Sequence, residues 1–299
     1  MRVVVSGASG LIGRALLPAL RDAGHEVVQL VRRAPRAPHE VRWDPAAGEL
    51  DAASLAGVDA AIHLSGAGVG EHRWTPAYKH VIRASRVDST RTLARALAAL
   101  EPAPRVLVSG SAIGAYGERG EEVLTEDSPR GGGFLADVVA EWEAATAPAA
   151  AAGVRVVHAR TGLVAAHRGG AFGQVLPLLR AGLGGPLGSG RQWWSAISMP
   201  DEVAALAFLL EADVSGPVNL TAPVPAHSAV LLRAIAAALH RPAVLPVPAL
   251  ALRAVLGEFA GEVLASQRVV PEVLLRAGFT FTHPDAASIA RWLADPAVR

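Results

Sequence analysis

The chain of 299 residues contains no cysteine. Disulfides, metal ligation through thiolates and cysteine nucleophiles are therefore excluded, and we expect a protein of the reducing cytoplasm. An excess of charge is also lacking, since 28 basic residues stand against 27 acidic ones and the basic residues are scattered. Such a balance gives no reason to expect nucleic acid or an acidic membrane surface as a partner.

Long uninterrupted apolar segments are missing as well. The N-terminus, MRVVVSGASG, turns polar and glycine-rich after a short apolar run, unlike a secretory signal. The longest apolar stretch, VLPVPALALRAVLGEFAG, is interrupted by Pro246, Pro248, Arg253 and Glu258. We therefore expect a soluble protein without a membrane span, and the length suits one or two domains with a large core.

Short runs rich in Val, Leu and Ile alternate with longer helical patterns over about the first 210 residues. Little polar alternation within the runs is typical of strands buried on both faces of a parallel sheet. The pattern predicts an α/β fold, a doubly wound parallel sheet of Rossmann type. The predicted strands are Arg2–Ser6, Glu26–Val31, Asp59–Leu64, Arg105–Ser109 and Val154–Ala159, and the predicted helices are Leu11–Ala23, Thr75–Leu100 and Phe134–Ala152.

Two details refine the helices and the C-terminal part. Pro18 lies inside the first predicted helix and predicts a local distortion there. After about residue 165 the chain becomes rich in glycine and aromatics, and from about residue 226 it contains two or three helices and a short β-like segment, GFTFTHP. This change of texture predicts a smaller C-terminal lobe.

A glycine pattern joins the first predicted strand to the first helix. In VVVSGASGLIGRALL, Gly7 permits a tight turn, Gly10 lets the backbone approach a pyrophosphate and Gly13 lets the helix pack close to the strand. The helix N-terminus then faces the phosphates. The pattern predicts a dinucleotide site, against the alternative of a structural glycine turn, with contacts from Gly7, Ser9, Gly10, Leu11, Ile12 and Gly13.

Two arginines follow the second predicted strand, where an acidic residue would favour NAD. Arg32 and Arg33 in VVQLVRR suit the additional 2′-phosphate of NADP, because a guanidinium matches it in charge and geometry. The alternative is a pair of solvated surface arginines. We predict NADP(H) as the cofactor.

Two later strands are followed by small and hydroxyl-bearing residues. The segment HLSGAG places Leu64, Ser65 and Gly66 beside the expected nicotinamide ribose, and His63 is expected to be a buried, hydrogen-bonded strand residue. The segment SGSAIGAYG presents Ser111 and Tyr116 at a strand's carboxyl end, where ligands bind in such sheets. Either hydroxyl can reach a substrate carbonyl there, unless it merely satisfies loop backbone.

These motifs together resemble a known family across nearly the whole chain. The matching pieces include SGASGLIG, HLSGAG, SRVDSTRTLARAL, SGSAIGAYG, GLGGPLGSGRQWW and GPVNLTAP. The chain resembles an atypical extended short-chain dehydrogenase/reductase, the epimerase family protein YfcH type, which animals represent as short-chain dehydrogenase/reductase family 39U member 1. Its tail, HRPAVLPVPALALRAVLGE with GFTFTHPD, resembles the small C-terminal domain DUF1731 of that subgroup.

The resemblance implies an NAD(P)-binding Rossmann-type domain over residues 1–225, with substrate-side loops from about 165, and a lobe over 226–299 that closes over a substrate cleft. It carries cofactor contacts onto the glycine loop, Arg32, Leu64, Ser65 and Arg86. The segment GSGRQWW is expected to line the substrate side through Arg191, Gln192, Trp193 and Trp194, unless the tryptophans only anchor the lobe. Ala196 and Ser198 stand where relatives often have Trp and His.

The wider superfamily uses a Tyr-x-x-x-Lys pair, in which the lysine lowers the pKa of the tyrosine and holds the ribose. The chain has two tyrosines, Tyr78 and Tyr116, and a single lysine, Lys79, and these do not form that pair. The expected slot lies in GGGFLADVVAEWEAA and holds apolar residues: Phe134 or Leu135, followed four positions later by Val138 or Val139.

Three ways of replacing the missing acid remain open. Tyr116 or Ser111 can take part, or Glu141 or Glu143 can serve if burial raises its pKa, although a surface or capping glutamate is the ordinary alternative. The third is that no acid is needed, because the protein binds NADP(H) without turnover.

We therefore expect an NADP(H)-binding oxidoreductase or epimerase-like protein that acts on an unidentified small molecule, with no metal ion. In related nucleotide-sugar enzymes the region similar to GSGRQWW contacts the substrate diphosphate. This resemblance suggests a nucleotide sugar as the class of substrate. The alternative is a catalytically silent NADP(H)-binding sensor or scaffold protein. The sequence predicts no oligomeric state.

Overall fold

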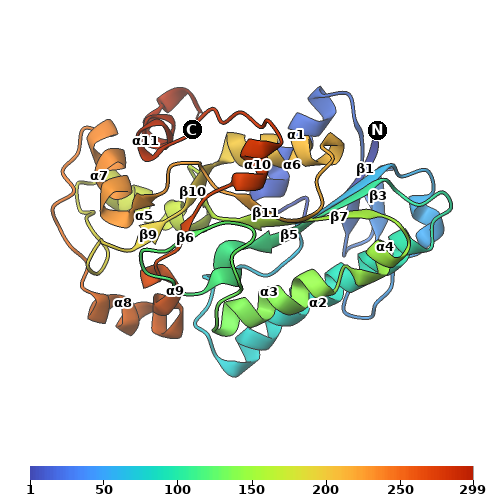
Figure 1. Ribbon diagram of the computed structural model, residues 1–299, viewed down its shortest axis with the longest axis horizontal. Helices are drawn as coiled ribbons and strands as arrows, with labels where there is room; N and C mark the ends of the chain where they lie inside the picture. Colours follow the sequence, from blue (N-terminus) through green and yellow to red (C-terminus); the bar gives the residue numbers. More distant parts are fainter. Residues whose placement is uncertain (299) are drawn as a thin grey trace.

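A seven-stranded parallel sheet forms the centre of the protein in the computed structural model, which describes residues 1–298 (Figure 1). The strand order is β3-β2-β1-β4-β5-β7-β11, which confirms the Rossmann-type doubly wound sheet. The strands are β1 (Arg2–Ser6), β2 (Glu26–Val31), β3 (Glu40–Arg42), β4 (Ala60–His63), β5 (Val106–Ala112), β7 (Arg155–Thr161) and β11 (Gly216–Leu220).

The five strands predicted from apolar runs are present, and the sheet adds two more. β3 is a short edge strand of alternating polarity, and β11 contains Pro217 and Asn219, so neither resembles a buried apolar run. β11 lies at the opposite edge, where Gly216 pairs beside Val157 of β7. An edge strand tolerates a proline because one of its sides needs no ladder hydrogen bonds.

Helices cover both faces of the sheet. Helices α1 (Leu11–Asp22) and α6 (Met199–Glu211) pack together on one face, and α2 (Pro76–Ala98), α3 (Phe134–Ala144) and α4 (Ala147–Ala151) lie on the other (Figure 1). Helix α2 begins as its sequence predicts, because the Thr75 hydroxyl accepts the Tyr78 amide and Pro76 takes the first helical position.

Two helices differ in detail from the prediction. The expected single helix over 134–152 is divided at Ala145 and Thr146, and α4 begins with a proline in its first turn. Helix α1 continues past Pro18 to Asp22, and the Pro18 ring is exposed. An exposed ring on the outer side of an amphipathic helix leaves the buried side of that helix free to pack on the sheet.

The smaller lobe lies at the carboxyl ends of the central strands and draws on two parts of the chain. Helices α5 (Gly170–Arg180), α7 (Ser228–Ala238) and α11 (Ala286–Ala294) enclose an apolar core that contains Phe172, Leu231 and Ile289. Short strand pairs support this core, β8 (Leu163–Ala165) with β10 (Ala196–Ser198) and β9 (Trp193–Trp194) with β12 (Ala226–His227).

The DUF1731-like tail adds short helices and a strand. They are α8 (Ala249–Leu256), the 3-10 turn η3 (Gly257–Phe259), α9 (Ala260–Leu264), β13 (Arg268–Val269) and α10 (Glu272–Arg276). β13 pairs with β6 (Val123–Leu124), which precedes α3 in the chain. The β-like GFTFTHP is not a strand: Phe279 and Phe281 instead pack edge to face, and Phe279 also contacts Phe208 of α6.

Within residues 1–298, none of the helices combines the length and the apolar character that a bilayer crossing requires.

Candidate functional site

The turn after β1 accepts glycine alone at two positions. Gly7 has a φ of +69°, and a Cβ atom on it would lie 2.5 Å from the carbonyl oxygen of Leu64. A Cβ atom on Gly13 would meet the Gly7 carbonyl oxygen and lie 2.9 Å from Ala8 Cα. The glycines thus let β1, β4 and α1 come together around one tight turn.

This turn opens a helix whose first amides are free. Gly10 is the N-cap of α1 and offers no side chain, and no acidic residue stands in the first turn. The first amides of a helix have no intrahelical acceptor, and they carry the positive end of the helix dipole. Ser9, Gly10 and Leu11 are exposed beside them. A diphosphate therefore fits this cradle.

The two arginines after β2 have different surroundings. Arg33 is held by Glu40 through two hydrogen bonds, of 2.8 and 2.6 Å. Arg32 is exposed, and no side chain among residues 1–298 pairs with it. Because Val5 of β1 lies opposite Gln29 of β2, Arg32 follows β2 beside the loop that begins at Gly7. Arg32 is the guanidinium free for a ligand.

Arg14 is a further basic residue at this turn that motif reasoning did not single out. Its Nε donates a hydrogen bond of 2.8 Å to the carbonyl oxygen of Ser9, which keeps an exposed guanidinium on the glycine loop. The available signal was its place directly after Gly13, one helical turn from the loop.

Side chains of α2 hold the loop after β4 through hydrogen bonds. Arg86 Nη1 donates to the carbonyl oxygens of Ala67 and Ile82 at 2.9 and 3.1 Å, and its guanidinium stacks on Trp142 at 5.2 Å. Burial lowers the pKa of Arg86 to about 10. Arg86 therefore holds the loop that carries Leu64, Ser65 and Gly66, and its Nη1 is already hydrogen-bonded within the protein.

His63 is a buried strand residue, as expected. Its Nδ1 lies 2.6 Å from Ser6 Oγ and its Nε2 lies 3.1 Å from Ser89 Oγ. Burial lowers the pKa of His63 to about 3, so the ring stays neutral and joins β1, β4 and α2.

Ser111 and Tyr116 belong to a buried network. Ser111 donates to Glu143 Oε1 at 2.7 Å, and Tyr116 donates to Asn219 Oδ1 at 2.8 Å while accepting from Arg160 Nη1 at 3.1 Å. Both side chains are buried, and burial raises the pKa of Tyr116. Both hydroxyls donate their hydrogen bonds inside the protein, and a contact of either one with a substrate stays a prediction.

Glu143 is the anion at the centre of this network. Arg160 donates to its two oxygens at 2.8 and 3.0 Å, and Arg130 adds a further hydrogen bond. Burial alone would raise the pKa of Glu143, but the hydrogen bonds from Arg160 and Ser111 and the charge of Arg160 outweigh it and bring the pKa to about 2. Glu143 therefore remains ionised and is no proton donor. Glu141 is half-exposed and pairs with Arg83.

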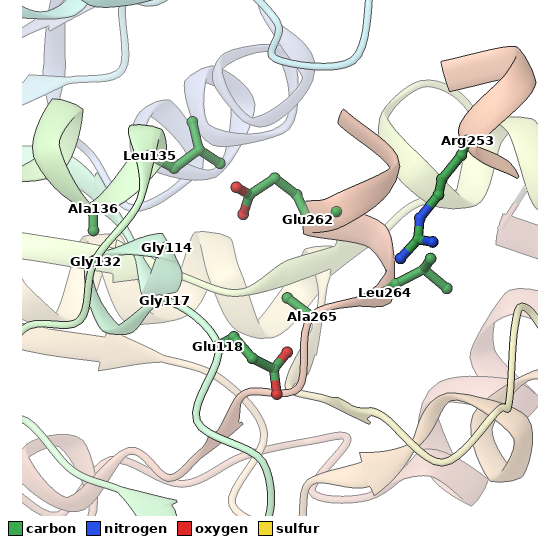
Figure 2. Close-up of a pocket in the computed structure, with 11 residues that line it drawn as sticks. Gly114, Gly117, Glu118, Gly132, Leu135, Ala136, Arg253, Glu262, Leu264 and Ala265 are labelled. Atoms are coloured by element: carbon green, nitrogen blue, oxygen red, sulfur yellow. The ribbon is translucent and has the colours of Figure 1, made fainter. Parts of the chain in front are cut away.

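A pocket of about 310 Å³ lies between the sheet domain and the tail (Figure 2). Its walls come from the turn after β5, the start of α3, and helices α8 and α9. Leu135, one of the two residues expected in the slot of the superfamily's tyrosine, lies on one wall. Four glycines leave the backbone open to a ligand. The lining residues are Gly114, Gly117, Glu118, Gly132, Leu135, Ala136, Arg253, Gly261, Glu262, Leu264 and Ala265.

Charged side chains reach this pocket mainly from the tail. Arg253 of α8 is exposed at it, and Glu262 of α9 extends into it. Nearby, the single lysine, Lys79, pairs with Glu258 of η3 at 2.5 Å and lies 4.9 Å from the ring centre of Phe134. Sequence spacing could not find these residues, because they come from α2 and from the tail. Within residues 1–298, no three His, Asp or Glu side chains gather as metal ligands would.

No residue of the segment GSGRQWW is among those that line this pocket, although its Trp193 amide donates a hydrogen bond of 3.0 Å to Ser266 Oγ of the tail. Most of its side chains are engaged within the protein. The centre of the Trp193 ring lies 4.4 Å from the guanidinium carbon of Arg268 and 4.0 Å from the centre of the His227 ring. Trp194 is buried, and its Nε1 donates a hydrogen bond to the carbonyl oxygen of Val263. Gln192 is buried, and its amide donates a hydrogen bond to the carbonyl oxygen of Leu187. The Arg191 side chain is exposed. The tryptophans therefore anchor the lobe. Ser198, in the position of the missing histidine, caps α6 and bonds His283 of the tail at 2.9 Å.

Comparison with known proteins gives consistent matches. Residues 3–221 match the NAD dependent epimerase/dehydratase family, and residues 247–293 match a domain of unknown function, DUF1731. The chain is 45% identical to an epimerase family protein of Mycobacterium bovis over 283 residues, which cover 94% of this chain and 93% of that protein.

Two solved structures are similar over nearly the whole chain. The human epimerase family protein SDR39U1 (isoform 2), crystallised with NADPH, superposes with a TM-score of 0.89 at 33% identity and covers 98% of this chain and 99% of its own. A nucleoside-diphosphate sugar epimerase of Corynebacterium glutamicum superposes with a TM-score of 0.78 at 38% identity, and the match covers 98% of this chain but 58% of that one.

Proposed function

The chain belongs to the NAD dependent epimerase/dehydratase family, and we propose that it is an NADP(H)-dependent oxidoreductase or epimerase-like enzyme that acts on a small polar molecule. The cofactor part rests on the glycine cradle and on Arg32, and the similarity to a human protein crystallised with NADPH supports it. The substrate part rests on the pocket between α3 and the tail.

The residues that would hold the coenzyme surround the carboxyl ends of β1, β2 and β4. The free first amides of α1 would bind the diphosphate, Arg32 and Arg14 would add positive charge, and the loop from Leu64 to Gly66 would line the ribose side. When bound, the coenzyme supplies a hydride donor or acceptor. Arg86 would act from beneath, by holding the loop in place.

The single observation that carries this proposal is the unpaired guanidinium of Arg32 beside a helix N-terminus that no side chain caps. The neighbouring Arg33 is neutralised by Glu40, so the two arginines form a natural comparison. One of them is free for a 2′-phosphate, and the other is not.

We expect Arg32→Ser to weaken NADPH binding by about 10- to 100-fold, the loss of one charge-assisted interaction, and to leave NADH binding nearly unchanged. Isothermal titration calorimetry with both coenzymes measures this. Arg33→Ser is the matched control and should change NADPH affinity much less, because Glu40 holds Arg33. Equal losses in the two variants, or a wild-type preference for NADH, would contradict the assignment.

The pocket indicates the class of substrate. Glycine-lined walls leave backbone groups open to hydroxyls, and Arg253 at the pocket offers a guanidinium to an anionic group. A polyhydroxy molecule with an anionic group, as in a nucleotide sugar, fits this combination. The similarity to a nucleoside-diphosphate sugar epimerase supports the same class.

A second candidate function is a catalytically silent NADP(H) sensor or scaffold. It is favoured by the apolar tyrosine slot, Phe134 or Leu135, and by the buried, hydrogen-bonded hydroxyls of Ser111 and Tyr116. Both functions require coenzyme binding, so turnover separates them. Incubation of the protein and NADPH with a metabolite extract, followed by mass spectrometry, should reveal a consumed metabolite if the protein is an enzyme. Tight NADPH binding with an unchanged extract would favour the sensor.

A further inference from the structure

One carboxyl in the pocket has no partner of its own. Glu262 projects from α9 across the pocket toward Leu135 at the start of α3 (Figure 2), and no hydrogen bond ties its side chain to another residue within 1–298. The other pocket carboxylate, Glu118, is used structurally, because its oxygens accept the amides of Ser266 and Gly120 at 2.5 and 3.0 Å.

The surroundings of Glu262 favour its protonated form. Burial raises the pKa of Glu262, and the negative charge of Glu258 on η3 raises it further. The other charged groups that line the pocket are Arg253 on α8 and Glu118 after β5. Lys79 on α2 is not among the lining residues, and its ammonium is paired with Glu258. A carboxyl whose pKa is raised in this way gives up its proton at a higher pH than an exposed glutamate does, and its carboxylate takes the proton back more readily.

The other candidate acids are committed elsewhere. Glu143 is held ionised by Arg160, Tyr116 and Ser111 hydrogen-bond inside the network, and Glu141 pairs with Arg83. None of them lines the pocket. The carboxyl that faces the tyrosine slot across the pocket is therefore that of Glu262, which belongs to the tail (Figure 2).

We propose that Glu262 is the proton donor and acceptor of this site, in place of the superfamily's tyrosine, an inference that rests on the proposed function. In reduction, a carboxyl oxygen of Glu262 gives its proton to the oxygen of a substrate carbonyl whose carbon receives a hydride. The carbonyl becomes an alcohol and the carboxyl becomes a carboxylate, which solvent reprotonates. In oxidation, the carboxylate takes the hydroxyl proton of the alcohol, whose carbon gives up a hydride to the oxidised coenzyme.

The test uses the charge that distinguishes the two forms of the coenzyme, since the oxidised nicotinamide ring is positive and the reduced ring is neutral. If Glu262 faces that ring, its ionisation strengthens binding of NADP⁺ but not of NADPH. The ratio of the two dissociation constants, NADP⁺ over NADPH, should fall about fivefold from about pH 5 to about pH 8, the size of one short charge–charge interaction in solvated surroundings. Titration of the 2′-phosphate affects both forms equally and cancels in the ratio.

Three variants make the measurement specific. Glu262→Gln, which keeps the shape of the side chain, should abolish the pH dependence of the ratio, and Glu262→Asp should retain part of it. Glu141→Gln, on the outside of α3, is the control and should behave as the wild type. Calorimetry gives each dissociation constant without a known substrate.

The outcomes separate the two proposals. Binding of both coenzymes with a ratio that does not change with pH, or with a pH dependence that Glu262→Gln retains, overturns the role of Glu262 and leaves the proposed function standing. Failure of the wild type to bind either coenzyme overturns the proposed function and this inference with it.

Discussion

At the scale of residues, the partner of a buried acid decides its charge. Glu143 and Glu202 are both buried, but Glu143 meets Arg160 while Glu202 meets a single hydroxyl, that of Thr161 at 2.8 Å. Burial therefore prevails at Glu202 and raises its pKa to about 8. The second oxygen of Glu202 has no hydrogen-bond partner among the described residues. A neutral carboxyl tolerates this better than a carboxylate.

We expect Glu202→Gln to stabilise the protein at neutral and higher pH and to have little effect near pH 4. Because folding raises the pKa of Glu202 from 4.5 to about 8, its contribution to stability is fully present below pH 4.5 and is lost as the pH rises to about 8. The loss at pH 7 is on the order of 3 kcal/mol. A glutamine can still accept the Thr161 hydrogen bond without ionising. Thermal unfolding of both proteins across this pH range measures the difference.

Glu143→Gln is the matched comparison, with the opposite sign. Folding lowers the pKa of Glu143 from 4.5 to about 2, so its ion pair stabilises the protein above pH 4.5 and is lost as the pH falls toward 2. The substitution leaves Arg160 without its partner, and we expect a loss of about 3–5 kcal/mol at neutral pH. If Glu202→Gln and Glu143→Gln changed the stability at neutral pH in the same direction, the different partners of the two acids would not explain their charge.

The fate of individual side chains was partly readable from the sequence. His63 was expected to be buried because a histidine inside an apolar strand needs partners there, and Ser6 and Ser89 provide them. Tyr116 could not be placed in the same way. Its partners Asn219 and Arg160 come from β11 and β7, and their approach depends on the order of strands in the sheet.

At the scale of elements, the crossover from β1 to α1 is set by how closely the backbone must approach. Gly13 lies in α1, where an alanine would ordinarily be favoured, but a Cβ atom there would collide with the turn at Gly7 and Ala8. The glycine spacing therefore reports a packing requirement as well as a ligand site.

We expect Gly13→Ala to lower stability by about 1–3 kcal/mol and to weaken NADPH binding, because the collision must move α1 away from the turn that forms the phosphate cradle. Gly261→Ala in α9 is the control: no atom lies within 4 Å of its Cβ position, so we expect no loss of stability. Urea unfolding and calorimetry measure both properties. Equal destabilisation of the two variants would argue against a specific collision at Gly13.

At the scale of the whole molecule, the tail is bound to the sheet through buried polar groups. Glu126 accepts the amides of Asn219 in β11 and Val273 in α10 at 3.0 and 3.2 Å. Asp201 at the start of α6 accepts the amides of Thr282 and His283 at 2.8 Å each. The pairing of β6 with β13 adds a third attachment. The lobe and the sheet domain should therefore unfold together.

We expect NADPH at about 100 times its dissociation constant to raise the unfolding midpoint by roughly 5 °C, because ligand binding adds about 2.7 kcal/mol to the stability of the folded state. The shift should appear in the lobe as well as in the sheet domain. Hydrogen-exchange mass spectrometry near the midpoint, on peptides from α11 and from α2, measures the two parts separately.

The Arg32→Ser variant is the control for this coupling, since it should show a smaller shift in both parts. Loss of protection in α11 at a temperature that NADPH does not change would show that the lobe unfolds independently of the sheet domain.

The sequence by itself determined five of the seven sheet strands, the glycine turn and the family. Each of these is written in neighbouring residues: apolar runs such as RVVVS form buried strands, and a glycine fits where a turn excludes a side chain. Arg32 and Arg33 look equivalent at that level. Only the fold distinguishes them, by bringing Glu40 of an edge strand to Arg33.

The pocket was decided by the tertiary structure alone. Leu135 and Glu262 are far apart in the chain, and they face each other because the tail packs over the start of α3. Spacing in a sequence records local geometry, whereas the charge and proton affinity of a side chain depend on what surrounds it after folding. The missing tyrosine was therefore visible in the sequence, but the carboxyl opposite its slot was not.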